Sequence, residues 1–365
     1  MTERRIHFVV PGALDQRTGG YLYDAHMVAE MRAAGRDVVV HELDGAFPVG
    51  DDVARSSMSA ALGRVGDDEL VVVDGLAGGG LPEELDRHAR RVRLVGLVHH
   101  PLADETGIPE AEATRLAASE RAALAVCRGV VVTSRFTAQR LGAYGVAARR
   151  IGVAVPGTRP APPASGPGAG APPQLLCVGS LTPRKGHVVL VEALAAVAEL
   201  EWTCAFAGSE TLDPAHALEV RRAVTEHGLE GRVSFLGELD EASLDRAYAG
   251  ASLFVLASYY EGYGMALTEA IVRGLPVLST TGGAIPYTVP AEAGVLVEPG
   301  QVGALARALR SLLVDPDGAL AKLRDGALRV AANLPDWPAA GVTFLSAVEK
   351  AGQGVPPGRS GAVAS

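Results

Sequence analysis

Short runs of β-branched and aliphatic residues, separated by longer stretches of helical period, constrain the fold of this chain more than any other feature. In the first half, the stretches between the runs repeat apolar residues about every 3.6 positions, as at residues 21–34 and 109–125. Strands that alternate with helices in this way predict βαβ units and a parallel sheet. The expected strands of the first half are residues 6–10, 37–41, 70–73, 92–98 and 130–133.

Residues 156–173 interrupt this alternation, because seven prolines and four glycines occupy their 18 positions and few apolar side chains remain to be buried. Such a composition predicts a linker or a surface loop beside one. The alternation begins again at residue 174, which predicts a second domain of the same class. Its expected strands are residues 174–178, 203–207, 233–236, 252–257 and 276–279, and its expected helices are residues 186–200, 214–227, 241–248 and 265–273.

The predicted fold class is therefore α/β, with two Rossmann-like parallel-sheet domains. A chain of 365 residues has an ordinary length for two such domains. We assign residues 1–155 to the N-terminal domain and residues 174–335 to the C-terminal domain. Residues 336–350 are expected to form a C-terminal helix, and packing back on the N-terminal domain is one option for it. Residues 351–365 are expected to form a flexible tail.

Charge and composition exclude several classes of function. The formal net charge is −9, from 33 basic and 42 acidic side chains, which argues against a nucleic-acid partner. The apolar stretch 188–208 contains three glutamates, so we expect no integral membrane segment, and the apolar run before Pro11 is too short for a signal peptide. The three cysteines lie in apolar runs and are expected to be buried thiols. These features predict a cytoplasmic protein, with peripheral binding at the inner membrane face left open.

Two adjacent cations follow the first expected strand of the C-terminal domain. The segment 179–186 reads Gly-Ser-Leu-Thr-Pro-Arg-Lys-Gly, and Thr182 with Pro183 is typical of a helix start. A helix N-terminus beside Arg184 and Lys185 suits a phosphate, because the guanidinium binds two oxygens and the ammonium supplies a compact charge. A basic turn on a solvated surface is the alternative interpretation.

Two carboxylates and two glycines follow a later strand of the same domain. The segment 261–269 reads Glu-Gly-Tyr-Gly-Met-Ala-Leu-Thr-Glu and leads into an expected helix. Glycines let the backbone approach a ligand closely, and the amides of a helix start face an anion. Glu261 and Glu269 would bracket this anion without touching it, as acceptors for the hydroxyl groups of a ribose and a sugar. Alternatively, Glu269 is an ordinary early-helix acid and Glu261 an exposed loop acid.

Together the two motifs resemble the family-four retaining glycosyltransferases of the GT-B fold, in which two Rossmann-like domains face a cleft. The resemblance covers the C-terminal domain well and the N-terminal domain loosely. It implies that Arg184 and Lys185 hold the diphosphate of a nucleoside-diphosphate sugar. Glu269 would hold the ribose, and Glu261 the transferred sugar. Further implied donor contacts come from Gly19, Gly20, Ser180, Gly262, Tyr263, Gly264, Met265, Ala266, Leu267, Gly282 and Gly283.

The resemblance also implies a catalytic histidine in the N-terminal domain. His99 follows the expected strand 92–98, where this family often places a histidine near the reacting sugar. With Arg184, Lys185 and Glu261, it would form the catalytic set. His100, Ser134 and Arg135 are candidate cleft residues, although Ser134 suits a helix N-cap equally well.

The implied reaction moves a sugar from a UDP- or GDP-linked donor to an unidentified acceptor hydroxyl, with retention of anomeric configuration. Its route would be front-face attack within a short-lived ion pair, in which the leaving phosphate accepts the proton of the acceptor. Two cations and helix N-termini can stabilise this leaving group, so we expect neither a cofactor nor a metal ion. Asp315-Pro-Asp317 formally matches a metal motif but is interpreted as a turn.

Two other interpretations remain open on the sequence alone. A phosphorylase or nucleotide-sugar epimerase shares the two-domain fold, and Lys185 would then be the candidate Schiff-base lysine. A noncatalytic two-domain binder of a nucleotide ligand is the second alternative. After Gly283 the chain lacks the carboxylate that many relatives carry, which leaves the sugar undetermined. The base, the acceptor, the linkage position and the oligomeric state are also open.

Overall fold

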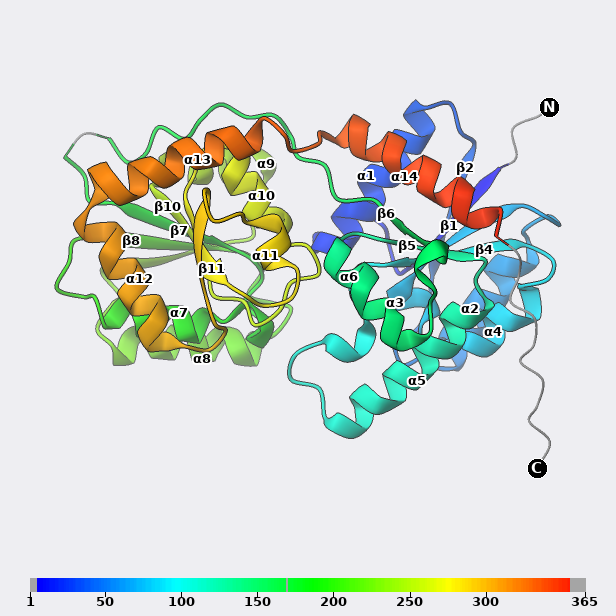
Figure 1. Cartoon of the computed structure of the whole chain (residues 1–365). Helices are drawn as coiled ribbons and strands as arrows, with labels where there is room; N and C mark the ends of the chain where they lie inside the picture. Colours follow the sequence, from blue (N-terminus) through cyan, green and yellow to red (C-terminus); the bar gives the residue numbers. More distant parts are fainter. Residues whose placement is uncertain (1–4, 169, 355–365) are drawn as a thin grey trace. The chain divides into compact units, whose positions relative to one another are not determined.

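The computed structural model describes residues 5–168 and 170–354, and the chain divides into two compact units. Unit 1 comprises Met1–Gly157 and Trp337–Ser365, and unit 2 comprises Thr158–Asp336. The polypeptide therefore passes from unit 1 to unit 2 after Gly157 and returns after Asp336 (Figure 1).

Unit 1 is built on a six-stranded parallel sheet in the order β2-β1-β3-β4-β5-β6. The strands are β1 (Ile6–Pro11), β2 (Val38–Leu43), β3 (Leu70–Asp74), β4 (Arg93–Val98), β5 (Gly129–Val132) and β6 (Ile151–Val153). All residues of β1 and β3 are buried, as expected of central strands covered on both faces. Val9 of β1 pairs with His41 of β2 on one side and with Val73 of β3 on the other.

Helices cover both faces of this sheet. Figure 1 shows α1 and α14 on one face and α2, α4 and α5 on the other, in agreement with their contacts. The helices are α1 (Gly19–Ala33), α2 (Asp52–Gly63), α3 (Gly75–Gly78), α4 (Pro82–His88), α5 (Glu110–Val126), α6 (Arg135–Arg140) and α14 (Trp337–Gly352), with short 3-10 turns at Leu102–Asp104, Leu141–Tyr144 and Ala148–Arg150.

The last helix, α14, belongs to unit 1 and lies against α1 and strands β3 to β6. Its contact with α1 is very close, because a Cβ at Gly341 would overlap the side chain of Glu30. Phe344 is fully buried and packs near Phe8 of β1, with ring centroids 6.3 Å apart. The C-terminal helix thus completes the core on one face of the first sheet.

Unit 2 contains a second six-stranded parallel sheet, in the order β12-β11-β10-β7-β8-β9. The strands are β7 (Gln174–Val178), β8 (Thr203–Ala207), β9 (Val233–Gly237), β10 (Leu253–Leu256), β11 (Val277–Thr280) and β12 (Gly294–Val297). In chain order this is the 3-2-1-4-5-6 arrangement of doubly wound dinucleotide-binding folds.

The helices of unit 2 also form two layers. Figure 1 shows α7, α8 and α12 on one face of the sheet and α9, α10 and α13 on the other. The helices are α7 (His187–Ala195), α8 (Pro214–Glu226), α9 (Glu241–Gly250), α10 (Met265–Val272), α11 (Ile285–Thr288), α12 (Val302–Val314) and α13 (Ala321–Ala331), with a 3-10 turn at Pro183–Lys185 and a π-helical turn at Pro316–Leu320.

The proline-rich segment differs from the predicted linker. Its described residues from Thr158 onward belong to unit 2. Ala164 is buried, and its amide donates to the carbonyl oxygen of Arg273 at 2.8 Å, while Ser165 N donates to the carbonyl oxygen of Ala249 at 2.9 Å. Backbone hydrogen bonds therefore hold a segment that has few apolar side chains to bury.

The predicted α/β class with two parallel sheets is confirmed. The sequence did not predict β6 and β12, which are only three and four residues long. Residues 355–365 of the predicted tail lie outside the described residues. All three cysteines are buried and free, as expected. Among the helices described, none has the length and apolar character needed to cross a membrane.

Candidate functional site

Unit 2 has its topological switch point between β7 and β10. The chain leaves β7 toward β8 and β9 on one side, and it leaves β10 toward β11 and β12 on the other. Loops that diverge in this way leave a crevice at the carboxyl ends of the strands, where ligands of open α/β sheets bind. Both predicted motifs lie here. Residues 179–186, the cation loop, follow β7, and residues 257–264, the Glu261 loop, follow β10.

The two loops meet through the carboxylate of Glu261. Lys185 Nζ lies 2.7 Å from Glu261 Oε1, and Arg184 Nη1 lies 3.4 Å from Glu261 Oε2. Arg184 Nη1 also donates to the carbonyl oxygen of Tyr260 at 2.9 Å, and the Ser258 hydroxyl donates to Glu261 Oε1 at 2.6 Å. The structure thus brings the two motifs together, but Glu261 contacts the cations directly instead of standing apart from them.

The three side chains of this site, Arg184, Lys185 and Glu261, are charged and in contact. Burial by itself would raise the pKa of Glu261, but the Lys185 ammonium and the Arg184 guanidinium lower it to about 2. Glu261 is 5% exposed, whereas 16% of the Lys185 side chain and 21% of the Arg184 side chain are exposed. Two cations and one carboxylate leave a net positive charge, and the exposed parts of the cations can bind an anion.

Glycines allow the loops of the switch point to lie close together. Gly186 has a φ of +66°, and a Cβ there would overlap the carbonyl oxygen of Ala257. A Cβ at Gly282 or Gly283 would overlap the backbone of the Glu261 loop. These two glycines, predicted as donor contacts, therefore already serve to place Glu261.

Helix α10 begins directly after the Glu261 loop and carries the predicted ribose carboxylate. Gly264 precedes the helix with a φ of +89°, and no side chain of the described residues caps the helix there. Glu269 Oε2 accepts a hydrogen bond from the Tyr248 hydroxyl at 2.9 Å. Burial raises the pKa of Glu269, although this hydrogen bond and the nearby Arg273 act in the opposite direction.

The other predicted donor contacts of unit 2 lie in the same loops or in the first turn of α10. Leu267 is fully buried in the core of unit 2, so only its backbone is available to a ligand. The partly exposed members of this set are Ser180, Gly262, Tyr263, Met265 and Ala266.

In unit 1, His99 follows β4 and lies between two buried carboxylates. Its Nε2 is 3.1 Å from Asp24 Oδ1 and 3.2 Å from Asp74 Oδ2. We call these three residues the His99 cluster. Asp24 belongs to α1, which follows β1, and Asp74 ends β3, so the cluster lies at the switch point of the first sheet.

The spacing of the His99 cluster also suits a metal ion, because one ligand atom from each residue lies within 4.8 Å of the other two. However, both carboxylates are already within hydrogen-bond distance of Nε2. A protonated Nε2 satisfies them without a metal ion. The prediction that the reaction needs none stays a prediction.

The remaining predicted residues near His99 have separate surroundings. Gly19 begins α1, and a Cβ at Gly20 would lie 3.3 Å from Cδ2 of the His99 ring. His100 Nε2 lies 3.4 Å from Glu105 Oε2 and takes no part in the His99 cluster.

Ser134 is used as a helix cap, the alternative that the sequence left open. Its side chain is buried and accepts a hydrogen bond from the amide of Thr137 at the start of α6. Arg135, directly after it, is exposed.

Sequence reasoning missed Asp24 and Asp74. Asp74 has the position of an ordinary N-cap after a strand, and it does accept a hydrogen bond from Leu76 N at 2.8 Å. Asp24 lies in α1 beside Tyr23 and one turn before Met27, both fully buried. A carboxylate on the apolar face of an amphipathic helix is the signal that could have identified it, because burying a charge is costly without a partner.

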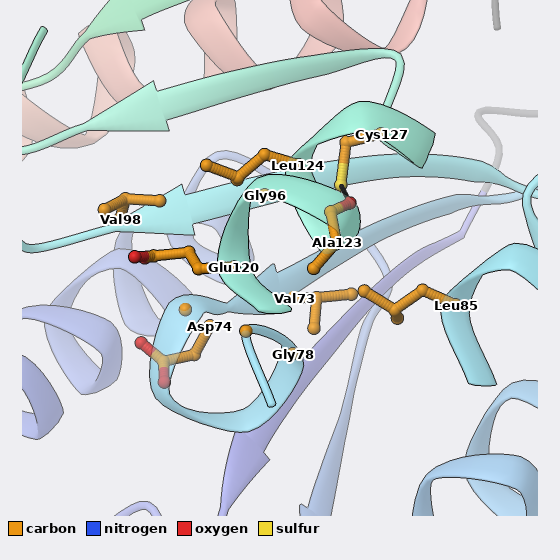
Figure 2. A pocket seen from close by; sticks show the side chains of 12 residues that line it. Val73, Asp74, Gly78, Leu85, Gly96, Val98, Glu120, Ala123, Leu124 and Cys127 are labelled. Atoms are coloured by element: carbon orange, nitrogen blue, oxygen red, sulfur yellow. Dashed lines mark hydrogen bonds between the residues drawn. The ribbon is translucent and has the colours of Figure 1, made fainter. Parts of the chain in front are cut away.

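A small pocket lies in unit 1 near the carboxyl ends of β3 and β4 (Figure 2). Asp74 and Glu120 line it together with glycines and apolar side chains. Its free volume of about 10 Å³ is close to the space that one water molecule needs. Glu120 Oε1 has no hydrogen-bond partner among the described residues, and burial raises the pKa of Glu120 to about 8. This pocket fits a water molecule, not a sugar.

Residues 164–328 match the family model described as glycosyl transferases group 1. The match includes both the cation loop and the Glu261 loop. Over these residues, unit 2 is similar to this family. The predicted resemblance to a glycosyltransferase family is thereby confirmed for this part of the chain.

Curated relatives match only part of the chain. Mannosylfructose-phosphate synthase of Agrobacterium fabrum is 32% identical over 117 residues, which cover 30% of this chain and 26% of that protein. Glycogen synthase of Mycobacterium tuberculosis is 33% identical over 177 residues, which cover 46% of this chain and 40% of that protein. The chain therefore spans less than half the length of these curated relatives.

A solved structure extends the likeness to both units. Sucrose-phosphate synthase from Thermosynechococcus elongatus has a TM-score of 0.79 at 23% identity, covering 95% of this chain and 98% of that chain. At this level of identity, the similarity shows the fold. The predicted GT-B class, with two Rossmann-like parallel-sheet domains, is confirmed.

Proposed function

We propose that this protein is a retaining glycosyltransferase, which moves a hexosyl group from a UDP- or GDP-linked sugar to the hydroxyl of an acceptor. The observation that carries the proposal is the meeting of Arg184, Lys185 and Glu261 at the switch point of unit 2. The site has a net positive charge and adjoins the start of α10, as a diphosphate requires.

The charge changes of the reaction explain why two cations are needed here. As the glycosidic bond stretches, positive charge grows on the sugar and negative charge grows on the departing diphosphate. Arg184, Lys185 and the first amides of α10 then stabilise the diphosphate more strongly than they stabilise the intact donor. Such stabilisation needs no divalent ion, and we expect transfer without one.

Glu261 orders this site and limits its charge. Its contacts hold two long side chains in place, which reduces the entropy that they lose when the donor binds. An ionised carboxylate only accepts hydrogen bonds. In our proposal, it accepts them from the hydroxyl groups of the transferred sugar. Glu269, oriented by Tyr248, accepts the ribose hydroxyls.

Unit 1 binds the acceptor in this proposal, and His99 orients the reacting sugar. The leaving phosphate accepts the proton of the acceptor hydroxyl after front-face attack, so no side chain is needed as a base. A Schiff-base role for Lys185, as in a phosphorylase, is disfavoured because its Nζ lies 2.7 Å from the carboxylate of Glu261 and is engaged there.

The test has a binding stage and a turnover stage. Thermal shift against UDP, GDP and ADP identifies the nucleotide, and transfer from the matching hexose donors is followed by NMR of the anomeric proton in the product. We expect Lys185→Ala to reduce transfer at least 100-fold, on the order of the loss of one transition-state charge contact. Lys322→Ala, which alters an exposed lysine of α13, is the matched control.

Nearly normal transfer by Lys185→Ala would contradict the assignment. Inversion of configuration in the product would contradict the retaining mechanism, and nucleotide binding without turnover of any donor would indicate a noncatalytic binder.

A further inference from the structure

The imidazole of His99 is held at one nitrogen by two acidic groups. Ionised carboxylates accept hydrogen bonds and do not donate them, so with Asp24 and Asp74 both ionised the contacts of 3.1 Å and 3.2 Å place a proton on Nε2. The other ring nitrogen, Nδ1, lies across the ring from both carboxylates and from Cδ2.

The partners of His99 are themselves fixed. Asp74 Oδ1 accepts hydrogen bonds from the backbone of α3, which leaves Oδ2 for His99. Asp24 is 2% exposed within the 15-residue helix α1. The Tyr23 ring packs edge-on against the imidazole, with centroids 5.4 Å apart and an interplanar angle of 84°. Rotation of the imidazole would break its contacts with Asp24, Asp74 and Tyr23.

The backbone of His99 is anchored as well. Its carbonyl oxygen accepts hydrogen bonds from the hydroxyls of Thr133 and Thr137, both at 3.2 Å. Gly20, at the start of α1, leaves room for the Cδ2 and Nε2 edge of the ring. Both ends of the residue are therefore held, while 21% of the side chain remains exposed.

The groups around the imidazole favour its charged form. Asp24 faces it from α1 and Asp74 faces it from the end of β3, whereas the Tyr23 hydroxyl points elsewhere and donates to the carbonyl oxygen of Ala154. Burial opposes the positive charge, but the two carboxylates outweigh burial and raise the pKa of His99 above its usual value. Burial also raises the pKa of Asp24 to about 7, and the charge and hydrogen bond of His99 act in the opposite direction.

We propose that Asp24 is a positioning residue of the transfer reaction: with Asp74 it holds His99 as an imidazolium whose Nδ1–H is presented to a substrate hydroxyl. The role in transfer rests on the proposed function, whereas the held charge does not. A histidine kept in this form donates a hydrogen bond throughout the reaction and cannot remove a proton from the acceptor. This agrees with a reaction in which the leaving phosphate is the base.

The first experiment needs no substrate. The protein is labelled with 15N-histidine, and the ring nitrogens of His99 are identified by comparison with His99→Asn. We expect both nitrogens to show imidazolium shifts at pH 7.5 in the wild type. In the isosteric variant Asp24→Asn, the titration midpoint should fall by about 1 to 3 pH units. Glu84→Gln, which alters a buried carboxylate of α4 outside the cluster, should leave the midpoint unchanged.

The second experiment measures transfer as a function of pH. In the wild type, loss of the His99 proton should not limit kcat below about pH 9. In Asp24→Asn, kcat should be lower by about 10-fold to 100-fold at pH 7.5 and should fall further across the lowered midpoint, whereas the donor KM changes little. A merely structural role would lower kcat without shifting this limb of the pH profile.

Three results would overturn the proposal. They are a neutral His99 at pH 7.5 in the wild type, an Asp24→Asn variant that titrates like the wild type, and a stoichiometric divalent ion that is lost on Asp24→Asn substitution. The wild-type titration remains decisive even if the variant does not fold. An imidazolium in a protein that transfers no hexose from any nucleotide donor would support the held charge and overturn the proposed function instead.

Discussion

Removal of Lys185 should destabilise unit 2 as well as weaken donor binding. The two cations beside Glu261 lower its pKa from 4.5 to about 2. Since one pKa unit corresponds to about 1.4 kcal/mol, this net shift, burial included, corresponds to about 3 kcal/mol of stability of unit 2 at neutral pH. Lys185 is the nearer cation, so Lys185→Met should lower the free energy of unfolding by about 2 kcal/mol.

The sign of the pH dependence follows from the lowered pKa. Glu261 is more acidic in the folded than in the unfolded chain, so its contribution is complete above about pH 5 and is lost as the pH falls toward 2. In Lys185→Met, this part of the acid dependence should become smaller.

A second substitution separates stability from binding. Lys185→Met combined with Glu261→Gln removes the ammonium and the carboxylate together, so no buried charge is left without its nearer partner. We expect the stability of this double variant to return to within about 1 kcal/mol of the wild type. Nucleotide binding should remain weak, because the site still lacks the ammonium.

The assay uses the two tryptophans of the chain. Trp202 is buried in the core of unit 2, whereas Trp337 belongs to unit 1. In a Trp337→Phe background, urea unfolding followed by fluorescence therefore reports on unit 2 alone, and isothermal titration of the nucleotide diphosphate measures binding. Lys322→Met is the control. A double variant that is as unstable as Lys185→Met would refute the reasoning, as would one that binds nucleotide normally.

Two further predictions concern Tyr248 and His41. Tyr248→Phe removes the hydroxyl that orients Glu269, so the Kd of the nucleoside diphosphate should rise about 10-fold. The Kd of the 2′,3′-dideoxy analogue of this nucleotide should stay the same. Equal changes of the two Kd values, measured by calorimetry, would contradict a contact between Glu269 and the ribose. Burial, followed by the charge of His7, lowers the pKa of His41 to about 4. The unfolded chain then binds the proton more readily than the folded chain, so the stability of unit 1 should fall by about 2 to 3 kcal/mol between pH 6.5 and pH 4. His41→Asn should abolish this fall. Urea unfolding followed by the fluorescence of Trp337 measures it.

Local patterns in the sequence were sufficient to predict most of the sheet. Central strands such as β1 and β3 are buried on both faces, so their residues form continuous apolar runs that can be recognised without the structure. The edge strands β6 and β12 are short and only partly buried, and they leave no such run. The packing of the described residues of this segment, such as Ala164 and Ser165, on unit 2 was also missed, because it depends on backbone hydrogen bonds that no side-chain pattern reveals.

Local patterns could not predict which loops, distant in the sequence, meet in the fold. Lys185 and Glu261 are 76 positions apart, and the resemblance to a family, not periodicity, suggested that they share a site. Asp24 and His99 are 75 positions apart, and neither the period of α1 nor the end of β4 specifies that they meet. The order of strands decides which loops are neighbours, and that order is a property of the whole fold.

The return of the chain to unit 1 sets an order for folding during synthesis. Residues 158–336 emerge from the ribosome before α14 does, so unit 2 has all of its sequence while unit 1 still lacks its final helix. Until Phe344 is made, Phe8 and neighbouring apolar groups of the first sheet remain without their cover. Unit 1 therefore cannot complete its core until α14 has been synthesised, and in that interval it exposes apolar surface that a chaperone can cover.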